Sequence, residues 1–408
     1  ALDGDEDAIV KIVKDSVRLE TLRKNTVDQK VRERVSKLRK TDFMRTSFRK
    51  RRVKQNEKLN LPQLFTTTIG SFPQTQDIRT ARSEYRRHAI RFQRNEITEE
   101  EFKTAEKSYE QFILEKIKHY VKQQEEIGLD VLVHGEPERN DMVEYFAEYL
   151  NGFALTENGW VKSYGTRCVK PPIIYGDVSR KEAMTVKWIT FAQRLTDKPV
   201  KGMLTGPATI YNWSFTPTPQ PSRELIYQIA LAIRDECIDL EEHGIRVIQI
   251  DEPALIERMP YDRGGRVEYL ETMISAFKLA SSGVKDETMI VTHMCYGNFE
   301  DIYPAILDMD ADVYTFEFAN SRQDLYAQFS NPLFDHGIGV GVVNVHTPEV
   351  ETVEEIERRV EKAVAIFPVE NISINPDCGL KTRGELETVE KLKNMVAAVR
   401  KVRDRIQQ

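Results

Sequence analysis

A histidine and a cysteine lie two positions apart in the segment Thr292-His293-Met294-Cys295. Side chains alternate in direction along an extended strand, so the two would point to the same side. An imidazole nitrogen and a thiolate held in this way can bind one zinc ion, which prefers a tetrahedral set of four ligands. A His-x-Cys pair is a weak signal by itself, and two more ligands would have to come from other segments.

Two further segments offer those ligands. Glu317 lies between Phe316 and Phe318, and Cys378 follows the stretch Asn375-Pro376-Asp377. If both follow neighbouring strands, their side chains would meet the first pair. The alternative is that Cys295 and Cys378 are inert buried thiols, which are common. The other two cysteines are interpreted differently: Cys237 packs in a helix, and Cys168 lies in a hairpin where it could touch a ligand but not the metal.

From about residue 61 onwards, short apolar or β-branched runs alternate with long segments of helical periodicity. This alternation predicts βαβ units and a parallel sheet. The eight predicted strands are 66–72, 130–136, 202–207, 247–253, 289–295, 313–318, 339–346 and 371–378, and the clearest helices are 99–126, 224–243 and 353–366. Runs 161–168 and 169–176 have no helix between them, so we interpret them as an inserted β-hairpin.

Nearly every predicted strand finishes on a reactive or polar residue. In chain order these residues are Ser71, Glu136, Thr205, Asp251, His293 with Cys295, Glu317, His346 and Cys378. The carboxyl ends of the strands in a (β/α)₈ barrel converge on one mouth, where catalytic groups lie. The sequence therefore predicts an α/β fold, a single (β/α)₈ barrel over residues 61–408.

Residues 1–60 form a predicted helical linker or extension. Apolar Ile9, Val13 and Val17 recur every four residues, as in an amphipathic helix. The stretch 31–60 is basic, most densely at Arg49-Lys50-Arg51-Arg52. It could be a nucleic-acid patch, but we favour a solvated helix face, which is the usual meaning of such a run.

Composition narrows the class of protein. Of the 408 residues, 40% are hydrophobic and 30% charged, as in soluble globular proteins, and no run approaches the roughly 20 apolar residues of a membrane helix. The net charge of −6 argues against general nucleic-acid binding. The start of the chain has no signal-peptide pattern and no initiator Met, so we expect a cytoplasmic protein and a processed chain or fragment. Four cysteines fit a reduced compartment better than a disulfide framework.

Six stretches, in order, resemble the cobalamin-independent methionine synthases. They are TTTIGSFPQT (66–75), HGEPERNDMVEYF (134–146), GMLTGP (202–207), IQIDEPAL (248–255), THMCY (292–296) and NPDCGLKTR (375–383). The resemblance covers residues 61–408 and corresponds to the C-terminal, catalytic half of that family. The first sixty residues resemble its linking helices, and its N-terminal barrel is absent here.

The resemblance implies a reaction. The methyl group of 5-methyltetrahydrofolate polyglutamate would move to the thiol of L-homocysteine, giving L-methionine, on one zinc ion in a monomeric enzyme. A free thiol is mostly protonated at neutral pH, and zinc removes that proton and holds the sulfur as a nucleophile.

The resemblance also assigns roles to particular residues. The implied zinc ligands are His293, Cys295, Glu317 and Cys378. The homocysteine-binding residues fall on Ile69, Gly70, Ser71, Glu136 and Asp251, and the folate-binding residues on Arg167, Cys168, Trp213 and Glu257. The implied proton donor is His346, although Asn344 stands where the family more often has an Asp that could orient this histidine.

Three alternatives stay open. The methyl donor could be a corrinoid or another methylated compound. The chain could also be a catalytically weak fragment, because the family's N-terminal half helps to hold the folate. A non-enzymatic, zinc-stabilised barrel that binds nucleic acid through residues 31–60 is a third possibility, and the acidic net charge counts against it.

Overall fold

The computed structural model describes Lys14, Ser16 and residues 26–162, 168–216, 222–295, 302–319, 325–329 and 334–408. Eight parallel strands form its central sheet, in the order β1-β12-β11-β10-β9-β8-β7-β2. Their bounds are β1 Phe65–Thr66, β2 Leu132–Val133, β7 Val200–Thr205, β8 Val247–Asp251, β9 Met289–Met294, β10 Val313–Phe316, β11 Gly337–Val343 and β12 Ile372–Pro376. All eight predicted strands are present.

The two edge strands of this sheet, β1 and β2, meet through backbone hydrogen bonds. The N–H groups of Asp130 and Val131 both donate to the Thr66 carbonyl oxygen at 3.0 Å, and the Phe72 N–H donates to the Gly135 carbonyl at 2.9 Å. The sheet therefore curls into a (β/α)₈ barrel, as predicted. Both edge strands are much shorter than expected, because the backbone leaves the sheet early to form loops at the mouth.

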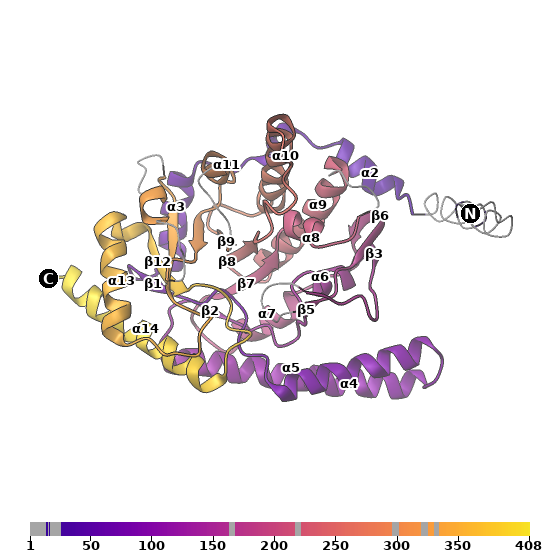
Figure 1. Ribbon diagram of the computed structural model, residues 1–408, viewed down its shortest axis with the longest axis horizontal. Helices are drawn as coiled ribbons and strands as arrows, with labels where there is room; N and C mark the ends of the chain where they lie inside the picture. Colours follow the sequence, from indigo (N-terminus) through magenta and orange to yellow (C-terminus); the bar gives the residue numbers. More distant parts are fainter. Residues whose placement is uncertain are drawn as a thin grey trace.

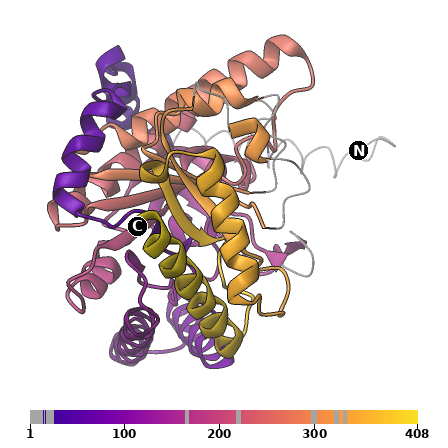
Figure 2. The same ribbon diagram turned by 90° about the vertical axis from the view of Figure 1, so that its left-hand side faces the viewer.

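Helices cover the outside of the barrel (Figures 1 and 2). Figure 2 shows α13 (Val353–Ile366) and α14 (Glu385–Ile406) side by side on one flank. The helices predicted at 99–126, 224–243 and 353–366 appear as α5 (Glu99–Ile127), α9 (Arg223–Glu242) and α13. Capping explains these starts: Thr98 and Thr352 each exchange hydrogen bonds with a Glu three residues later. The remaining helices on the barrel are α7 Val186–Gln193, α8 Pro207–Asn212, α10 Arg263–Ser281, α11 Tyr303–Asp308 and α12 Leu325–Phe329.

A long helical arm projects between β1 and β2. It consists of α4 (Gln76–Gln93) packed along α5, and Figure 1 shows it running past the edge of the barrel. Stacked rings hold its outer part together, with Tyr85 over Tyr109 at 4.7 Å and Phe92 over Phe102 at 4.8 Å. No helix in the described part of the chain is long and apolar enough to cross a membrane.

The inserted β-structure is larger than predicted. The inner pair is right: β4 (Val161–Lys162) pairs antiparallel with β5 (Cys168–Val169). The outer part is wrong, because β6 (Ile173–Arg180) pairs with an earlier strand, β3 (Leu150–Ala154), which follows the short helix α6 (Glu144–Glu148). The insertion is thus two nested antiparallel ribbons.

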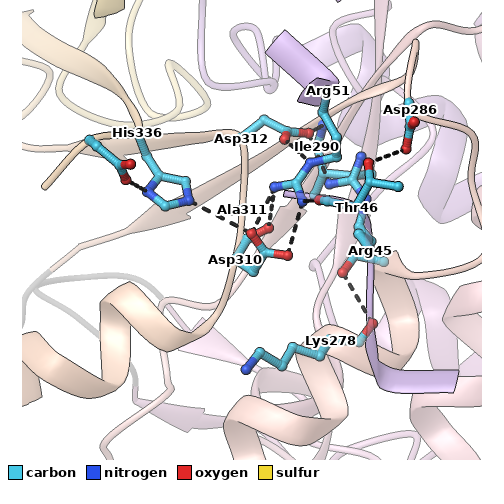
Figure 3. A network of polar contacts seen from close by, with 12 residues as sticks. Arg45, Thr46, Arg51, Lys278, Asp286, Ile290, Asp310, Ala311, Asp312 and His336 are labelled. Atoms are coloured by element: carbon cyan, nitrogen blue, oxygen red, sulfur yellow. Dashed lines mark hydrogen bonds and ion pairs between the residues drawn. The ribbon is translucent and has the colours of Figure 1, made fainter. Parts of the chain in front are cut away.

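The extension wraps the barrel through α2 (Gln29–Ser36), the 3₁₀ turn η1 (Lys40–Phe43) and α3 (Phe48–Leu59). Two of its arginines are buried against acids that precede β10 (Figure 3). Arg51 contacts Asp312 at 2.7 Å and Asp310 at 2.8 Å, and Arg45 contacts Asp312 at 2.9 Å. The interpretation of the basic run as a solvent face is therefore wrong at Arg45 and Arg51. Ile9, Val13 and Val17 lie outside the described residues.

Candidate metal centre and substrate cavity

Three of the four predicted metal ligands come together at the mouth of the barrel. His293 is near the end of β9, Cys295 follows that strand directly, and Cys378 lies two residues beyond β12. The ligand atoms of these three side chains all lie within 4.8 Å of one another. Strands β9 and β12 are separated in the sheet by β10 and β11, so the curvature of the barrel brings these side chains together.

The hydrogen bonding of His293 leaves one ring nitrogen available. Its Nδ1 lies 3.0 Å from the Thr315 hydroxyl, which itself donates to the Thr292 carbonyl oxygen at 3.0 Å. Because the hydroxyl proton of Thr315 is used there, its oxygen must accept a hydrogen bond from Nδ1–H of His293. Nε2 is buried without a hydrogen-bond partner among the described residues. A second group that fixes Nδ1–H and leaves Nε2 free is the usual arrangement behind a metal-bound histidine.

The charges of the three side chains also suit a cation. The interaction with Cys295 lowers the pKa of Cys378 well below its ordinary value, and His293 adds to this effect. The same interaction, together with burial, raises the pKa of Cys295. Burial lowers the pKa of His293, but Cys378 and nearby carboxylates outweigh it and raise the value to about 9. A divalent cation would replace the protons that otherwise hold this group together.

The fourth predicted ligand, Glu317, lies just beyond β10 but outside the close group of three. Its Oε1 is 3.3 Å from Nε2 of His346, the predicted proton donor. That contact raises the pKa of His346, against the opposing effect of burial. Asn344 accepts a hydrogen bond from the His346 backbone N–H at 2.8 Å, so this contact holds the loop.

A cavity of about 630 Å³ lies above the three ligands. All five predicted homocysteine-binding residues line it, as do three of the predicted folate or proton-transfer residues: Ile69, Gly70, Ser71, Glu136, Asp251, Trp213, Glu257 and His346. Trp213 donates from Nε1 to Glu257 at 2.6 Å. Cys168 is exposed on β5 and is not a lining residue, and Arg167 lies outside the described residues.

Glu136 occupies an unusual backbone position. Its φ is +59° and that of Gly135 is +88°, both in the left-handed region that costs a residue with a Cβ about 1–2 kcal/mol. This turn aims the Glu136 carboxylate into the cavity, where it pairs with Arg139 at 3.3 Å. Arg139 is itself held by Glu138 at 2.9 Å.

Asp251 ends β8 and is held by a neighbour on its own strand. Its Oδ1 accepts a hydrogen bond from Gln249 at 2.7 Å. Burial raises the pKa of Asp251 to about 7, partly offset by His293 and Gln249, and lowers that of Lys201 to about 7. The opposite charges of Asp251 and Lys201 counteract both shifts.

Comparison with known proteins identifies this architecture. Residues 64–401 match the family described as "Cobalamin-independent synthase, Catalytic domain". The chain belongs to this family. The family resemblance predicted from the six sequence stretches is thereby confirmed.

Two curated relatives of this chain carry the same enzyme name. The chain is 50% identical, over 92% of its length, to the 5-methyltetrahydropteroyltriglutamate–homocysteine methyltransferase 3 (chloroplastic) of Arabidopsis thaliana, and covers 45% of that protein. It is 51% identical over 93% of its length to a Campylobacter jejuni protein named 5-methyltetrahydropteroyltriglutamate–homocysteine methyltransferase, and covers 49% of it. The chain therefore spans about half the length of these relatives.

Solved structures share the fold of this synthase domain. A B12-independent methionine synthase from Shewanella, in complex with selenomethionine, superposes with a TM-score of 0.69 at 22% identity, covering 85% of this chain and 99% of that one. A putative vitamin-B12-independent methionine synthase from Listeria monocytogenes gives 0.63 at 20% identity, covering 84% and 98%.

Three buried polar residues at or beneath the cavity, Arg139, Lys201 and Gln249, have no role in the sequence-based prediction. Arg139 was overlooked inside the HGEPERNDMVEYF stretch, and Lys201 and Gln249 were not singled out. A signal did exist for Lys201, because a charged residue interrupts the apolar run of β7. Gln249 lies two residues before Asp251 and hence on the same face of β8.

Proposed function

We propose that this chain transfers the methyl group of 5-methyltetrahydropteroyltriglutamate to the sulfur of L-homocysteine, producing L-methionine. The observation that carries the proposal is the group of His293, Cys295 and Cys378 at the floor of the cavity. The printed names of the curated relatives support the same substrates.

Zinc is the metal we propose for this site, one ion per chain. One imidazole and two thiolates are the ligand types that zinc prefers, and Nε2 of His293 has no hydrogen-bond partner among the residues that the structure describes. Glu317 is the proposed fourth ligand, and it is the hard oxygen donor among softer ones. Bound zinc supplies a thiolate nucleophile at neutral pH.

The substrate's amino-acid end is assigned to the walls of the cavity. Glu136 and Asp251 would bind the ammonium group, and Ser71 the carboxylate, through charge-assisted hydrogen bonds that fix orientation. Ile69 and Gly70 complete this wall. A Cβ on residue 70 would lie 2.7 Å from Met203 Cε and 2.8 Å from Glu136 Oε1, so a side chain here would displace the ends of both side chains.

The methyl donor is assigned to the outer part of the cavity. Trp213 offers a flat face for the pterin ring, and Glu257, Arg167 and Cys168 are the other proposed folate contacts. When the carbon–nitrogen bond of the donor breaks and the sulfur–carbon bond forms, the folate nitrogen must gain a proton. His346 is the proposed donor of that proton, and Glu317 favours its charged form.

The remaining assignments describe the setting of the reaction. Residues 1–60 are proposed as an extension and 61–408 as the catalytic barrel, acting as a monomer in the cytoplasm. The proposed donor carries a polyglutamate tail, part of which the N-terminal half of longer relatives would hold.

A turnover assay tests this proposal. Zinc-loaded protein is given homocysteine with either 5-methyltetrahydropteroyltriglutamate or methylcobalamin, and methionine is quantified. We expect methionine from the folate alone, and none from either donor after a chelator has removed the metal. Methionine from methylcobalamin only would overturn the folate assignment.

A further inference from the structure

Two buried polar side chains lie beneath the cavity and have no part in the chemistry described so far. Lys201 on β7 is 1% exposed and Gln249 on β8 is 0% exposed. A lysine inside a barrel is costly unless its ammonium group is fully paired. What these two side chains contact therefore indicates what they do.

Lys201 contacts two oxygen atoms that can only accept hydrogen bonds. Its Nζ donates to the Thr68 carbonyl oxygen at 2.7 Å and to Oε1 of Gln249 at 2.5 Å. Thr68 directly precedes the Ile69-Gly70-Ser71 wall of the cavity. The lysine thus ties β7 and β8 to the segment that carries this wall.

Gln249 connects Lys201 to the residues that line the cavity. Its Nε2 donates to Oδ1 of Asp251 at 2.7 Å and to the Ile69 carbonyl oxygen at 3.0 Å. The amide orientation is determined twice, because Lys201 requires the oxygen on its side and the Ile69 carbonyl requires the nitrogen on the other. A flipped amide would set two pairs of oxygen atoms against each other.

We propose that Lys201 and Gln249 are positioning residues that set the recognition of the substrate's ammonium group, by holding Asp251 and the Ile69 carbonyl oxygen on one side of the cavity. This inference rests on the proposed function. Each of those oxygen-bearing groups keeps a further lone pair for a ligand. Together, Asp251 and the Ile69 carbonyl oxygen are specific for a thiol substrate that carries an α-ammonium group.

Ligand binding to the zinc-loaded protein tests the inference without turnover. L-Homocysteine and 4-sulfanylbutanoate have the same thiol and carboxylate, and only the first has an ammonium group. Calorimetric titration gives a Kd for each, and their ratio measures recognition of that group. In the wild type we expect homocysteine to bind at least about tenfold more tightly, as befits hydrogen bonds to a charged group.

The decisive variant is Gln249→Met, which fills similar space and cannot bridge Lys201 to Asp251. We expect it to reduce the ratio to about threefold or less, through weaker homocysteine binding and an almost unchanged Kd for the analogue. The matched control is Gln228→Met, since Gln228 is equally buried and donates to Asp177 at 2.9 Å, between α9 and β6. That control should keep the wild-type ratio.

A second variant, Lys201→Met, keeps the amide but removes the donor that holds its oxygen, so it should lower the ratio in the same direction. A wild-type ratio in the folded, zinc-loaded Gln249→Met or Lys201→Met variant would overturn the inference. Failure of the proposed function looks different, because wild-type protein would then bind neither thiol.

Discussion

At the scale of single residues, the proposed metal site depends on side chains that would not themselves bind the ion. The Thr315 hydroxyl holds Nδ1 of His293 and thereby determines which nitrogen faces the cysteines. Groups behind a metal ligand usually change metal affinity by 10–100-fold when removed. The orientation of the Glu136 side chain likewise depends on its surroundings, namely a left-handed turn and the ion pair with Arg139.

Replacing the hydroxyl behind His293 should weaken metal binding. Thr315→Val keeps the shape of the side chain and removes the acceptor for Nδ1–H, so we expect the zinc Kd to rise by about 10–100-fold in competition with a chromogenic chelator. The control is Thr292→Val on β9, since the Thr292 hydroxyl donates to the Ile250 carbonyl at 2.8 Å. Equal zinc affinities in the two variants would contradict this role of Thr315.

The turn before Glu136 should tolerate glycine only. In Gly135→Ala the new Cβ would lie 2.5 Å from the Tyr120 ring at a φ of +88°, so we expect about 2–5 kcal/mol of destabilisation from backbone strain and overpacking together. Gly244→Ala has a similar φ of +91° and open space, so it should cost only the strain, about 1–2 kcal/mol. Urea unfolding measures both, and equal losses would show that the Tyr120 contact does not matter.

At the scale of elements, β10 connects two distant features. Asp312 precedes this strand and pairs with the arginines of the extension, while Glu317 follows it at the cavity. The ends of the strands were predictable because a polar residue follows each apolar run in the sequence. The acidic partners of the arginines were not predictable, because Arg51 and Asp312 are 261 positions apart. A basic run contains no local signal that one of its arginines pairs with a buried acid.

Removing the buried arginine should destabilise the protein without emptying the metal site. Arg51→Met leaves Asp310 and Asp312 short of a partner, and breaking such a buried pair costs about 3–5 kcal/mol. The neighbouring Arg49→Met removes an exposed contact to Asp335 of 3.8 Å and should cost under about 1 kcal/mol. Urea unfolding and zinc content check both effects; a similar small loss in the two variants would mean that Arg51 does not anchor the extension.

Segments with a local sequence pattern were predictable, whereas contacts between distant segments were not. The strand positions and three long helices were predictable from periodicity, and the predicted site residues that line the cavity from strand ends and the family resemblance. Arg139 also lines the cavity and was not predicted. The nested ribbon was not predictable, because β6 pairs with β3, a segment that gave no strand signal of its own. The Lys201–Gln249 contact was also hidden, since it depends on the adjacency of β7 and β8.

At the scale of the whole molecule, this chain is one barrel of a family whose curated relatives are about twice as long. The proposed zinc ligands and homocysteine-binding residues all belong to this barrel. Of the proposed folate contacts, Trp213 and Glu257 line the cavity, and Cys168 is exposed on the inserted ribbon. Because the proposed folate tail extends beyond these contacts, the two substrates should depend differently on the other half of the longer relatives.

We accordingly expect homocysteine to bind this chain as tightly as it binds a full-length relative, and the folate to bind more weakly. The measurement is a comparison of KM for 5-methyltetrahydropteroyltriglutamate, with calorimetric Kd values for homocysteine as the internal reference. Equal KM values for the two proteins would contradict the expectation that the other half of the longer relatives holds part of the donor.

Elemental analysis of the protein decides whether His293, Cys295 and Cys378 hold one zinc ion at the floor of the cavity. We expect one zinc per chain in freshly prepared, reduced wild-type protein, and a sharp fall in Cys378→Ser, with and without homocysteine. A wild-type protein that contains no zinc and takes none up on titration would contradict the proposed chemistry, although it would not affect the assignment of the barrel fold.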